Sequence, residues 1–338
     1  MATICRVVVS SLLLVLSFAL LLGGAYLFTN AVEWAGARLN LGRGATGSIL
    51  AAVATALPES LIPVVAIISG EEGGQVAIGA VIGAPFLLGT LALALVGVSA
   101  YVFRGRRQQG AVIQAGRVST ERDLVVFMIF LAIALVLGLV PIRPLHIAAA
   151  VVFVVAYAAY AWRTIAASRG DEEGEELHDL FFDPSKHDPP HNAQIVLQVV
   201  VGLGLIVGGA HLFVHEVEAI AHTIGVSALV LALVLAPLAS ELPEKFNSFL
   251  WVRGGKDTLA LGNITGAMVF QSMLPVAVGM AFTTWELAAA PTVAAACALA
   301  GGALCLLAVH RGGRFSVPFV STWAAFYLGA TAYIIIAT

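Results

Sequence analysis

Ten apolar stretches, each long enough to cross a lipid bilayer as a helix, dominate this sequence. A helix needs about 20 predominantly apolar residues to cross the hydrocarbon core, where only helices and closed barrels satisfy their own backbone hydrogen bonds. The stretches are residues 6–28, 44–69, 75–103, 122–140, 144–163, 194–216, 225–251, 257–283, 286–309 and 315–337. We therefore predict an all-α membrane protein with ten transmembrane helices.

Composition supports this fold class and excludes others. Of the 338 residues, 60% are hydrophobic and only 11% are charged, which is more apolar surface than a soluble fold can bury. The net charge of −3 includes no basic excess, so we expect no nucleic-acid partner. The expected partners are the lipid bilayer and transported cations, and the expected oligomeric state is a monomer.

The basic residues orient the predicted helices, because cytoplasmic loops of membrane proteins are enriched in Lys and Arg. With the N-terminus outside, 14 of the 17 basic residues fall in cytoplasmic loops, and the other three are Arg6, Arg143 and Lys245. We predict an integral protein of the plasma (inner) membrane whose N-terminus and C-terminus both lie outside.

The two halves of the chain repeat each other at an offset of 185 residues. Residues 23–28 (GGAYLF) match residues 208–213 (GGAHLF), and residues 57–59 match residues 242–244, which both read LPE. Each half contains five apolar stretches, so the second half enters the bilayer from the opposite side. Two inverted-topology five-helix repeats are typical of secondary transporters, whose ion sites lie near the midplane between the repeats.

A long polar stretch joins the halves. We divide the chain into a first membrane repeat at residues 1–163, an acidic cytoplasmic linker at residues 164–192 and a second membrane repeat at residues 193–338. Residues 171–191 hold eight of the 20 acidic residues. We interpret this stretch as a solvated loop, and the alternative is a regulatory cation site.

A proline followed by a glutamate recurs inside the second apolar stretch of each half. Proline lacks an amide N–H, so we predict helix breaks at Pro58 and Pro243 that free carbonyl groups to line a cavity. Glu59 and Glu244 beside such carbonyls would form an oxygen-rich site for Ca²⁺, Na⁺ or protons, and the repeat symmetry predicts that they approach each other at mid-membrane. The hydroxyl groups one helical turn before these glutamates belong to Thr55 and Ser240.

The third apolar stretch of each half carries glycines four residues apart. Gly79 and Gly83 in the first half correspond to Gly262 and Gly266 in the second, and this spacing predicts close helix packing. Asn263 adds an amide that needs a partner inside the membrane, and a bound cation is one such partner.

These doubled motifs resemble the signature repeats of the calcium/cation antiporter superfamily, of the sodium/calcium exchanger type. Residues 55–59 (TALPE) and 240–244 (SELPE) are similar to that family's G-T-S-L-P-E, and the glycine motifs are similar to its G-N-x-x-G-S-N. The resemblance covers both halves. It implies ten helices, inverted repeats, and Glu59 and Glu244 as the central cation ligands.

Departures from the family pattern concentrate at oxygen ligands. Ala80 and Ala84 replace an asparagine and a serine in the first half, and Ala56 and Glu241 stand where the family has serine. Glu241 adds a third carboxylate near the centre, and we count it among the candidate ion-binding residues. Oxygen atoms that would line flanking sodium sites are therefore missing, which favours proton coupling.

A lysine also lies beside the predicted site. Lys245 follows Glu244 and lies four residues after Glu241, so Lys245 and Glu241 share a face on a continuous helix. One interpretation is a neutralising ion pair that takes no part in transport. The other is a proton-responsive pair that acts as a proton-coupling element, since a low-dielectric setting favours the neutral forms of both groups.

Weaker candidates complete the pattern. Gln271 would line the ion path or bond a neighbouring helix, and His211 and His215 are interpreted as interfacial. No H-E-x-x-H or G-x-S-x-G motif is present, and our interpretation places no aspartate inside a span apart from Asp257 at a boundary. We predict that the chain is not an enzyme and needs no cofactor.

Together these features predict a secondary active cation antiporter that works by alternating access. The exchanged ions are expected to be Ca²⁺, or another hard cation, and H⁺. A Na⁺/Ca²⁺ or Na⁺/H⁺ exchanger is the alternative within this class, and a non-transporting scaffold or sensor is the alternative outside it.

Overall fold

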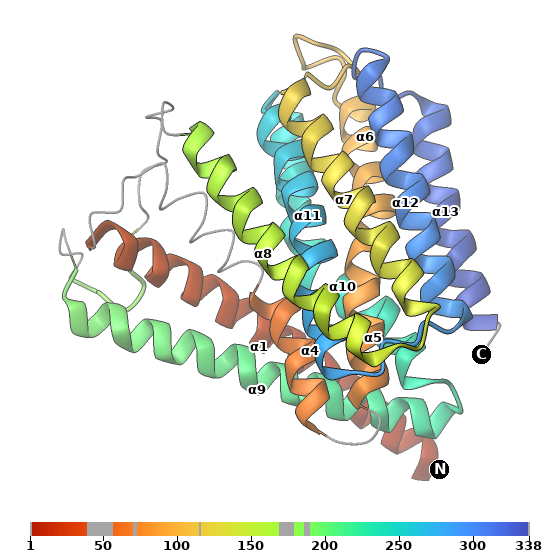
Figure 1. Cartoon of the computed structure of the whole chain (residues 1–338). Coiled ribbons are helices and arrows are strands. Elements are labelled where there is room, and N and C mark those ends of the chain that lie inside the picture. The colour runs from red at the N-terminus through yellow and green to blue at the C-terminus, as the bar shows by residue number, and fades with distance from the viewer. Residues whose placement is uncertain are drawn as a thin grey trace.

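The computed structural model describes residues 2–38, 57–69, 73–114, 116–168, 179–185 and 190–336. Within these ranges the chain is helical without a β-strand, and one isolated antiparallel bridge joins Val112 to Arg314. The helices are α1 (Ala2–Arg38), α4 (Leu57–Ser69), α5 (Gly73–Leu87), the π-helical turn η2 (Leu88–Ala92), α6 (Leu93–Val102), α7 (Arg117–Gly138), α8 (Arg143–Ser168), α9 (Asn192–Ile224), α10 (Ala228–Arg253), α11 (Asp257–Phe282), α12 (Ala289–His310) and α13 (Val317–Ile336), as Figure 1 shows.

Seven segments of the described chain are long and apolar enough to cross a membrane. They are Val7–Ala35, Gly73–Val102, Arg143–Thr164, Asn192–Ile224, Asp257–Phe282, Ala289–His310 and Val317–Ile336. The other three predicted spans coincide with α4, α7 and α10. Charged residues near the start of α7 and in the middle of α10 make these two helices less apolar. α4 is short in the described structure, because the residues before Leu57 lie outside the described ranges. The all-helical membrane fold is confirmed, and the count of ten spans stays a prediction.

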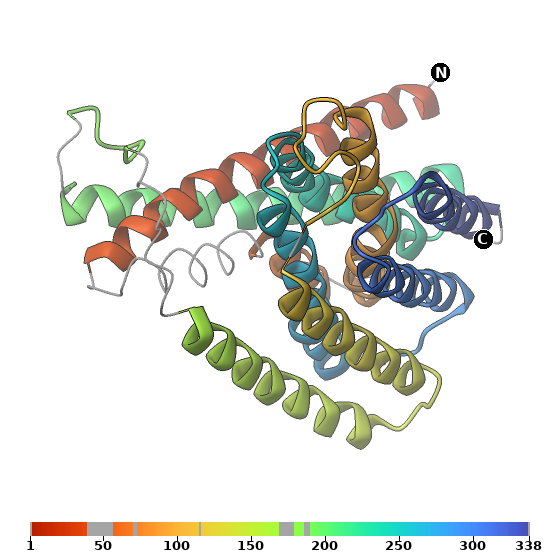
Figure 2. The same ribbon diagram turned by 90° about the horizontal axis from the view of Figure 1, so that it is seen from above.

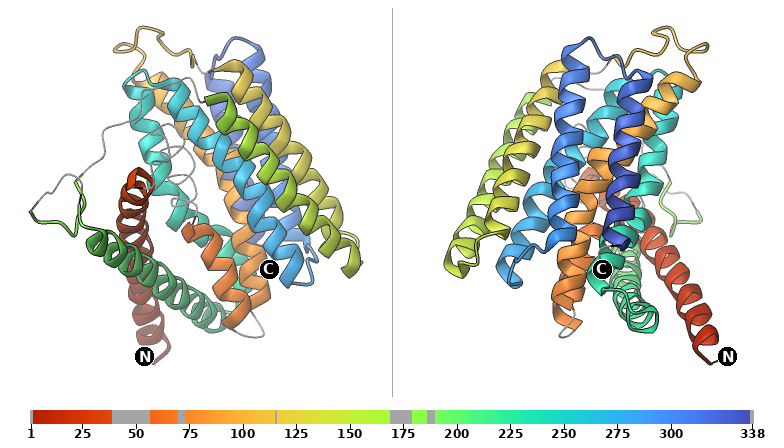
Figure 3. Two further views of the ribbon diagram at one scale, coloured as in Figure 1. Left: turned by 60° about the vertical axis from the view of Figure 1, so that its left-hand side comes forward. Right: turned by 90° about the vertical axis from the view of Figure 1, so that its right-hand side faces the viewer.

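Two long helices cross the rest of the molecule at a steep angle. Figures 1 and 2 show α1 and α9 side by side and running in opposite directions, while the remaining helices form a bundle of roughly parallel rods. Both chain ends lie toward the same end of the molecule, as the two views in Figure 3 show.

Glycines set the crossing of α1 and α9. A Cβ atom on Gly24 would lie 2.9 Å from the backbone nitrogen of Ile206, and one on Gly209 would lie 3.0 Å from that of Leu21. Small residues let helix backbones approach in this way. Gly24 and Gly209 are 185 residues apart, as are Leu21 and Ile206, so the offset of the sequence repeat also relates these two contacts to each other.

α5 is the central packing helix of the bundle, and every residue from Val76 to Leu87 is buried. Its glycines face α10. A Cβ atom on Gly79 would lie 2.3 Å from the carbonyl oxygen of Leu229, and one on Gly83 would lie 2.2 Å from that of Leu233. No larger residue fits at either position without moving one helix away from the other.

Three loops are tied together at the end of the molecule opposite the chain ends. The buried guanidinium of Arg107, in the α6–α7 loop, donates to the Asp257 carboxylate at 2.8 Å and to the carbonyl oxygen of Val252, both at the α10–α11 connection. The backbone N–H of Ile113 donates to Gly313, in the α12–α13 loop, at 2.8 Å. A buried ion pair is stable only when its remaining donors are satisfied, and Arg107 also donates to two carbonyls of its own loop.

Part of the acidic linker is docked onto α1 and α9 rather than solvated. The buried amide of Gln198 donates to the carbonyl of Leu27 and to the side chain of Asn30, at 2.9 and 2.8 Å, and accepts from the backbone N–H of Phe182 at 2.9 Å. Leu180 is buried in a small apolar cluster with Trp34 and other residues of α1 and α9. The solvated-loop interpretation is therefore wrong for Leu180 and Asp183, which are buried, while residues 179, 181, 184 and 185 are exposed.

Candidate ion-binding site

α10 is continuous from Ala228 to Arg253, so the prediction that Pro243 breaks this helix is wrong. Proline removes one backbone donor, but a helix packed on several sides tolerates the loss because neighbouring groups hold it in place. α10 contacts both α5 and α11. Since the helix does not break, Glu241, Lys245 and Ser248 lie on one face of it at a spacing of four and then three residues.

The middle of this face holds a buried pair of opposite charges. The Nζ of Lys245 lies 3.3 Å from Oε2 of Glu241, and the two residues are only 2% and 1% exposed. The amide of Gln271, on α11, donates to Oε1 of Glu241 at 2.9 Å. Each carboxylate oxygen therefore has a protein partner, which is how a membrane protein accommodates ionised groups at depth.

A second polar contact continues the α10–α11 interface two turns away. The side-chain amide of Asn263 donates to the hydroxyl of Ser248 at 3.2 Å, and Ser248 is fully buried. Asn263 and Gln271 are eight residues apart, so they lie on the same face of α11. Five side chains of α10 and α11 make these contacts. We call them the polar seam: Glu241, Lys245, Ser248, Asn263 and Gln271.

Ser240 lies next to the polar seam on α10. It is buried, and its hydroxyl donates to the carbonyl of Ala236 at 3.0 Å, one turn earlier in the same helix. The hydroxyl hydrogen is thus used within the helix, while the oxygen atom keeps lone pairs that can accept a bond or contact a cation.

The first-half candidates lie largely outside the described residues. Thr55 precedes α4, and although Pro58 and Glu59 belong to its first turn, only their backbone is described. The side chain of Glu244 is likewise outside the description. The approach of Glu59 to Glu244 therefore stays a prediction.

The glycines of α11 differ from those of α5 in their described surroundings. No described atom outside the local helix lies within 4 Å of a Cβ built on Gly262 or Gly266. The repeat offset relates the α10 partners of Gly79 and Gly83 to residues 44 and 48, which the structure does not describe. Close packing at the two α11 glycines stays a prediction.

A buried carboxylate that our sequence interpretation missed lies on the other side of α11. Oδ1 of Asp123, on α7, accepts from the hydroxyl of Tyr160 at 2.8 Å and from the guanidinium of Arg122 at 3.0 Å, and Oδ2 accepts from the hydroxyl of Thr265 at 3.0 Å. The interpretation that no aspartate other than Asp257 lies in a span is wrong, because Asp123 falls inside the apolar stretch 122–140. The place of Asp123 inside this apolar stretch could have identified it as a buried carboxylate from the sequence.

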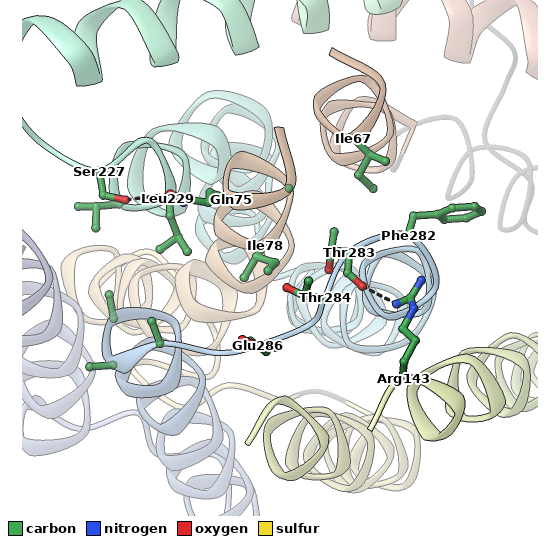
Figure 4. A pocket seen from close by; sticks show the side chains of 15 residues that line it. Ile67, Gln75, Ile78, Arg143, Ser227, Leu229, Phe282, Thr283, Thr284 and Glu286 are labelled. Carbon is green, nitrogen blue, oxygen red and sulfur yellow. Dashed lines mark hydrogen bonds between the residues drawn. The ribbon is translucent and has the colours of Figure 1, made fainter. Parts of the chain in front are cut away.

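A cavity of about 850 Å³ lies at the end of the molecule that carries the chain ends. Its walls include the starts of α5 and α10 and the end of α11. Figure 4 shows Gln75 and Ser227 on one side and Arg143 reaching the carbonyl of Thr283 on the other. Glu286 provides a carboxylate at the wall. The cavity thus combines apolar walls with a few polar groups at that end of the bundle.

The outer histidines form no cluster with metal-binding composition. His215 is exposed and its Nδ1 lies 3.0 Å from the carboxylate of Glu216. Among the described residues, no group of three or more His, Cys, Asp or Glu side chains could hold a metal ion.

Comparison with known families decides the assignment that these motifs suggest. Residues 9–166 and 194–336 match the family described as sodium/calcium exchanger protein. The chain belongs to this family. The match covers both halves and omits the linker, so the recognition made from the doubled Leu-Pro-Glu motif is confirmed.

Two curated relatives are similar to this chain in sequence. “Uncharacterized membrane protein MJ0091” of Methanocaldococcus jannaschii is 25% identical over 267 residues, which cover 79% of this chain and 80% of that protein. “Putative antiporter CaxA” of Alkalimonas amylolytica is 34% identical over 91 residues, and this stretch spans only 28% of the length of CaxA.

Solved structures show the same fold. The H⁺/Ca²⁺ exchanger CAX has a TM-score of 0.69 at 18% identity, with 97% of this chain and 86% of that chain covered. The sodium-calcium exchanger NCX_Mj has a TM-score of 0.56 at 22% identity, with 97% and 99% covered. At these identities the likeness establishes the fold alone.

Proposed function

We propose that this exchanger is a secondary active antiporter that exchanges Ca²⁺, or another hard cation, for protons by alternating access. The observation that carries the proposal is the polar seam, which holds a buried carboxylate next to the second Leu-Pro-Glu motif. Ionised groups at membrane depth are costly and are retained where ions pass. Neither an enzymatic role nor a cofactor is part of the proposal.

The proposed topology has ten transmembrane helices in two inverted repeats, with the repeat boundaries at residues 1–163 and 193–338. The paired contacts of Gly24 with Ile206 and of Gly209 with Leu21 support it, because they obey the repeat offset. Both halves of the site belong to one chain, which supports a monomer. Orientation with both termini outside the plasma membrane rests on the distribution of Lys and Arg.

The proposed ion ligands are Glu59 and Glu244, with added oxygen atoms from Thr55, Ser240 and Asn263. Charge counting supports a divalent cargo. If Lys245 neutralises Glu241, the remaining two glutamates carry a charge of −2, which one Ca²⁺ or two protons would balance. Hard divalent cations prefer such oxygen ligands.

Proton coupling is favoured over sodium coupling by the alanines of α5. Ala80 and Ala84 are buried and offer no side-chain oxygen where the family motif has asparagine and serine. A Na⁺/Ca²⁺ or Na⁺/H⁺ exchanger is the second candidate, and it would need to draw its sodium ligands from backbone carbonyls.

Alternating access requires one part of the molecule to move against another. α1 and α9 contact each other along their length and cross the bundle obliquely (Figure 1), whereas Arg107 ties the loops of α6, α7, α10 and α11 together. This division supports α1 and α9 as the moving pair and the bundle as the fixed part.

The test is transport by the purified protein in proteoliposomes, followed with radioactive calcium and an internal pH dye, with and without a sodium gradient. We expect calcium uptake coupled to proton efflux without sodium, and a cation affinity that falls as pH drops, because protons compete for the same glutamates. Glu59→Gln should abolish exchange in a folded protein, while Glu121→Gln, at the start of α7, serves as the control.

Three results would reject the proposal in different ways. Wild-type flux in Glu59→Gln would reject the ligand assignment. Strict dependence on sodium with a pH-independent calcium affinity would favour the Na⁺/Ca²⁺ exchanger. Absence of all flux from a folded wild-type protein would favour a non-transporting relative.

A further inference from the structure

The polar seam contains a positive charge that belongs to the protein itself. Lys245 is 2% exposed and its Nζ lies 3.3 Å from a carboxylate oxygen of Glu241. Burying a lone ammonium in an apolar medium costs a large free energy, so a buried lysine needs an anionic partner, and Glu241 provides one.

Both oxygen atoms of Glu241 have protein partners. Oε2 faces the ammonium of Lys245, and Oε1 accepts from the amide of Gln271 at 2.9 Å. Gln271 comes from α11 and Lys245 from α10, so the carboxylate is fixed from two helices. This geometry holds Glu241 in place as the anionic partner of Lys245.

The two charges are also absent together from the other half. At the repeat offset of 185 residues, Glu241 corresponds to Ala56 and Lys245 corresponds to Ser60. The second half thus carries a carboxylate and a cation that the first half lacks at these positions, and together they add no net charge.

We propose that the Lys245 ammonium is a tethered cation: it occupies, beside Glu241, the place that a monovalent cation from solution would otherwise fill. The proposal rests on the proposed antiport function and specifies its ion requirement. A buried carboxylate needs a compensating charge in every state of the transport cycle. A covalently attached cation is always present at high effective concentration, so the exchanger needs no sodium or potassium ion at this position.

Two substitutions separate the charge of Lys245 from its volume. Lys245→Ala removes the charge and leaves space for a small cation, whereas Lys245→Met removes the charge and fills the space. The double variant Glu241→Gln with Lys245→Met removes both charges. Lys256→Met, at an exposed lysine before α11, is the control.

Each variant is assayed in choline medium with added sodium, potassium or ethylammonium chloride. The readouts are calcium flux in proteoliposomes and the midpoint of thermal unfolding in detergent. In choline, we expect the flux of Lys245→Ala to fall about tenfold or more below the wild-type flux. The substitution leaves Glu241 buried without its counter-charge. One or more of the small cations should restore flux and raise the unfolding midpoint of this variant.

Lys245→Met should lose flux without rescue, and the double variant should keep its flux with no dependence on the added cation. Wild-type flux of Lys245→Ala in choline, or a folded Lys245→Ala that no cation restores, would overturn the proposal. If Lys245→Ala does not fold in any of these media, the double variant decides: a folded, cation-independent double variant supports the tethered cation, and an unfolded or inactive one overturns it.

The unfolding measurement keeps the two proposals separate. If the wild-type protein transports nothing, the antiport function fails, while stabilisation of Lys245→Ala by small cations would still support a cation seat beside Glu241. If the wild-type protein transports calcium and Lys245→Ala shows neither rescue nor stabilisation, only the tethered cation fails.

Discussion

α5 and α11 carry the same glycine motif, but they use it in different ways. On α5, the residues from Val76 to Leu87 are buried and apolar or small, and Gly79 and Gly83 press against the backbone of α10. α11 instead bonds through its side chains on two faces, to α10 through Asn263 and Gln271 and to α7 through Thr265.

The difference shows that two helices with matching glycine motifs can make different kinds of contact. A buried polar group must find a partner, so each one on α11 fixes a neighbouring helix in one position. A buried glycine or alanine makes no such demand and contributes only shape. α5 therefore supplies close packing, and α11 supplies polar contacts.

The largest effect should come from breaking the charge pair that α11 supports. Glu241→Gln leaves Lys245 as a buried cation without its carboxylate, which typically costs about 3–5 kcal/mol. We expect a large fall in the thermal unfolding midpoint. Restoring charge balance with Lys245→Met in the same protein should recover most of it. Equal damage from the single and double variants would show that the pair contributes nothing to stability.

A smaller effect should follow from spoiling the packing of α5. In Gly83→Ala the new methyl group would lie 2.2 Å from the carbonyl oxygen of Leu233, so α5 and α10 must separate. Overpacking of this kind costs about 1–3 kcal/mol. Gly329→Ala is the matched control, because Gly329 is exposed on α13 and its Cβ would meet no described atom within 4 Å. An unchanged midpoint for both variants would contradict the packing role of α5.

The smallest effect should come from the outer face of α11. Thr265→Val keeps the shape of the side chain and removes one hydrogen bond to Asp123, which retains Tyr160 and Arg122 as partners. One such bond contributes about 1 kcal/mol. Thr322→Val, at a half-buried threonine of α13 whose hydroxyl donates only to a carbonyl one turn earlier in its own helix, gives the baseline. If the two variants unfold at the same temperature, Thr265 does not help to fix α11 on α7.

The helices and the family were predictable from the sequence, because both are indicated by patterns of neighbouring residues. The apolar stretches predicted the helices, and the doubled Leu-Pro-Glu predicted the family. The spacing of Glu241 and Lys245 places them on one face only if the helix is continuous, and the predicted break at Pro243 left their contact open. The structure gives a distance of 3.3 Å between them. Gln271 was ambiguous, since a glutamine in a helix does not reveal which neighbour it faces.

What escaped prediction depends on contacts between distant segments. Arg107 and Asp257 are 150 residues apart and meet only because their loops lie at the same end of the bundle. The predicted helix break at Pro243 was wrong for a related reason. The chemistry of proline predicts a break, while packing of α10 between α5 and α11 keeps the helix continuous.

Arg107 ties the loops at one end of the bundle together, and Arg143 holds α11 at the other end. The guanidinium of Arg143, on α8, donates to the carbonyl oxygens of Met280, Ala281 and Thr283 in the last turn of α11 and just after it. α11 has 26 residues, so it is about 39 Å long and is held at both ends. The cavity that contains Arg143 and Glu286 lies beside the second of these ties. A change in the tilt of α11 would therefore have to break contacts at one end or the other.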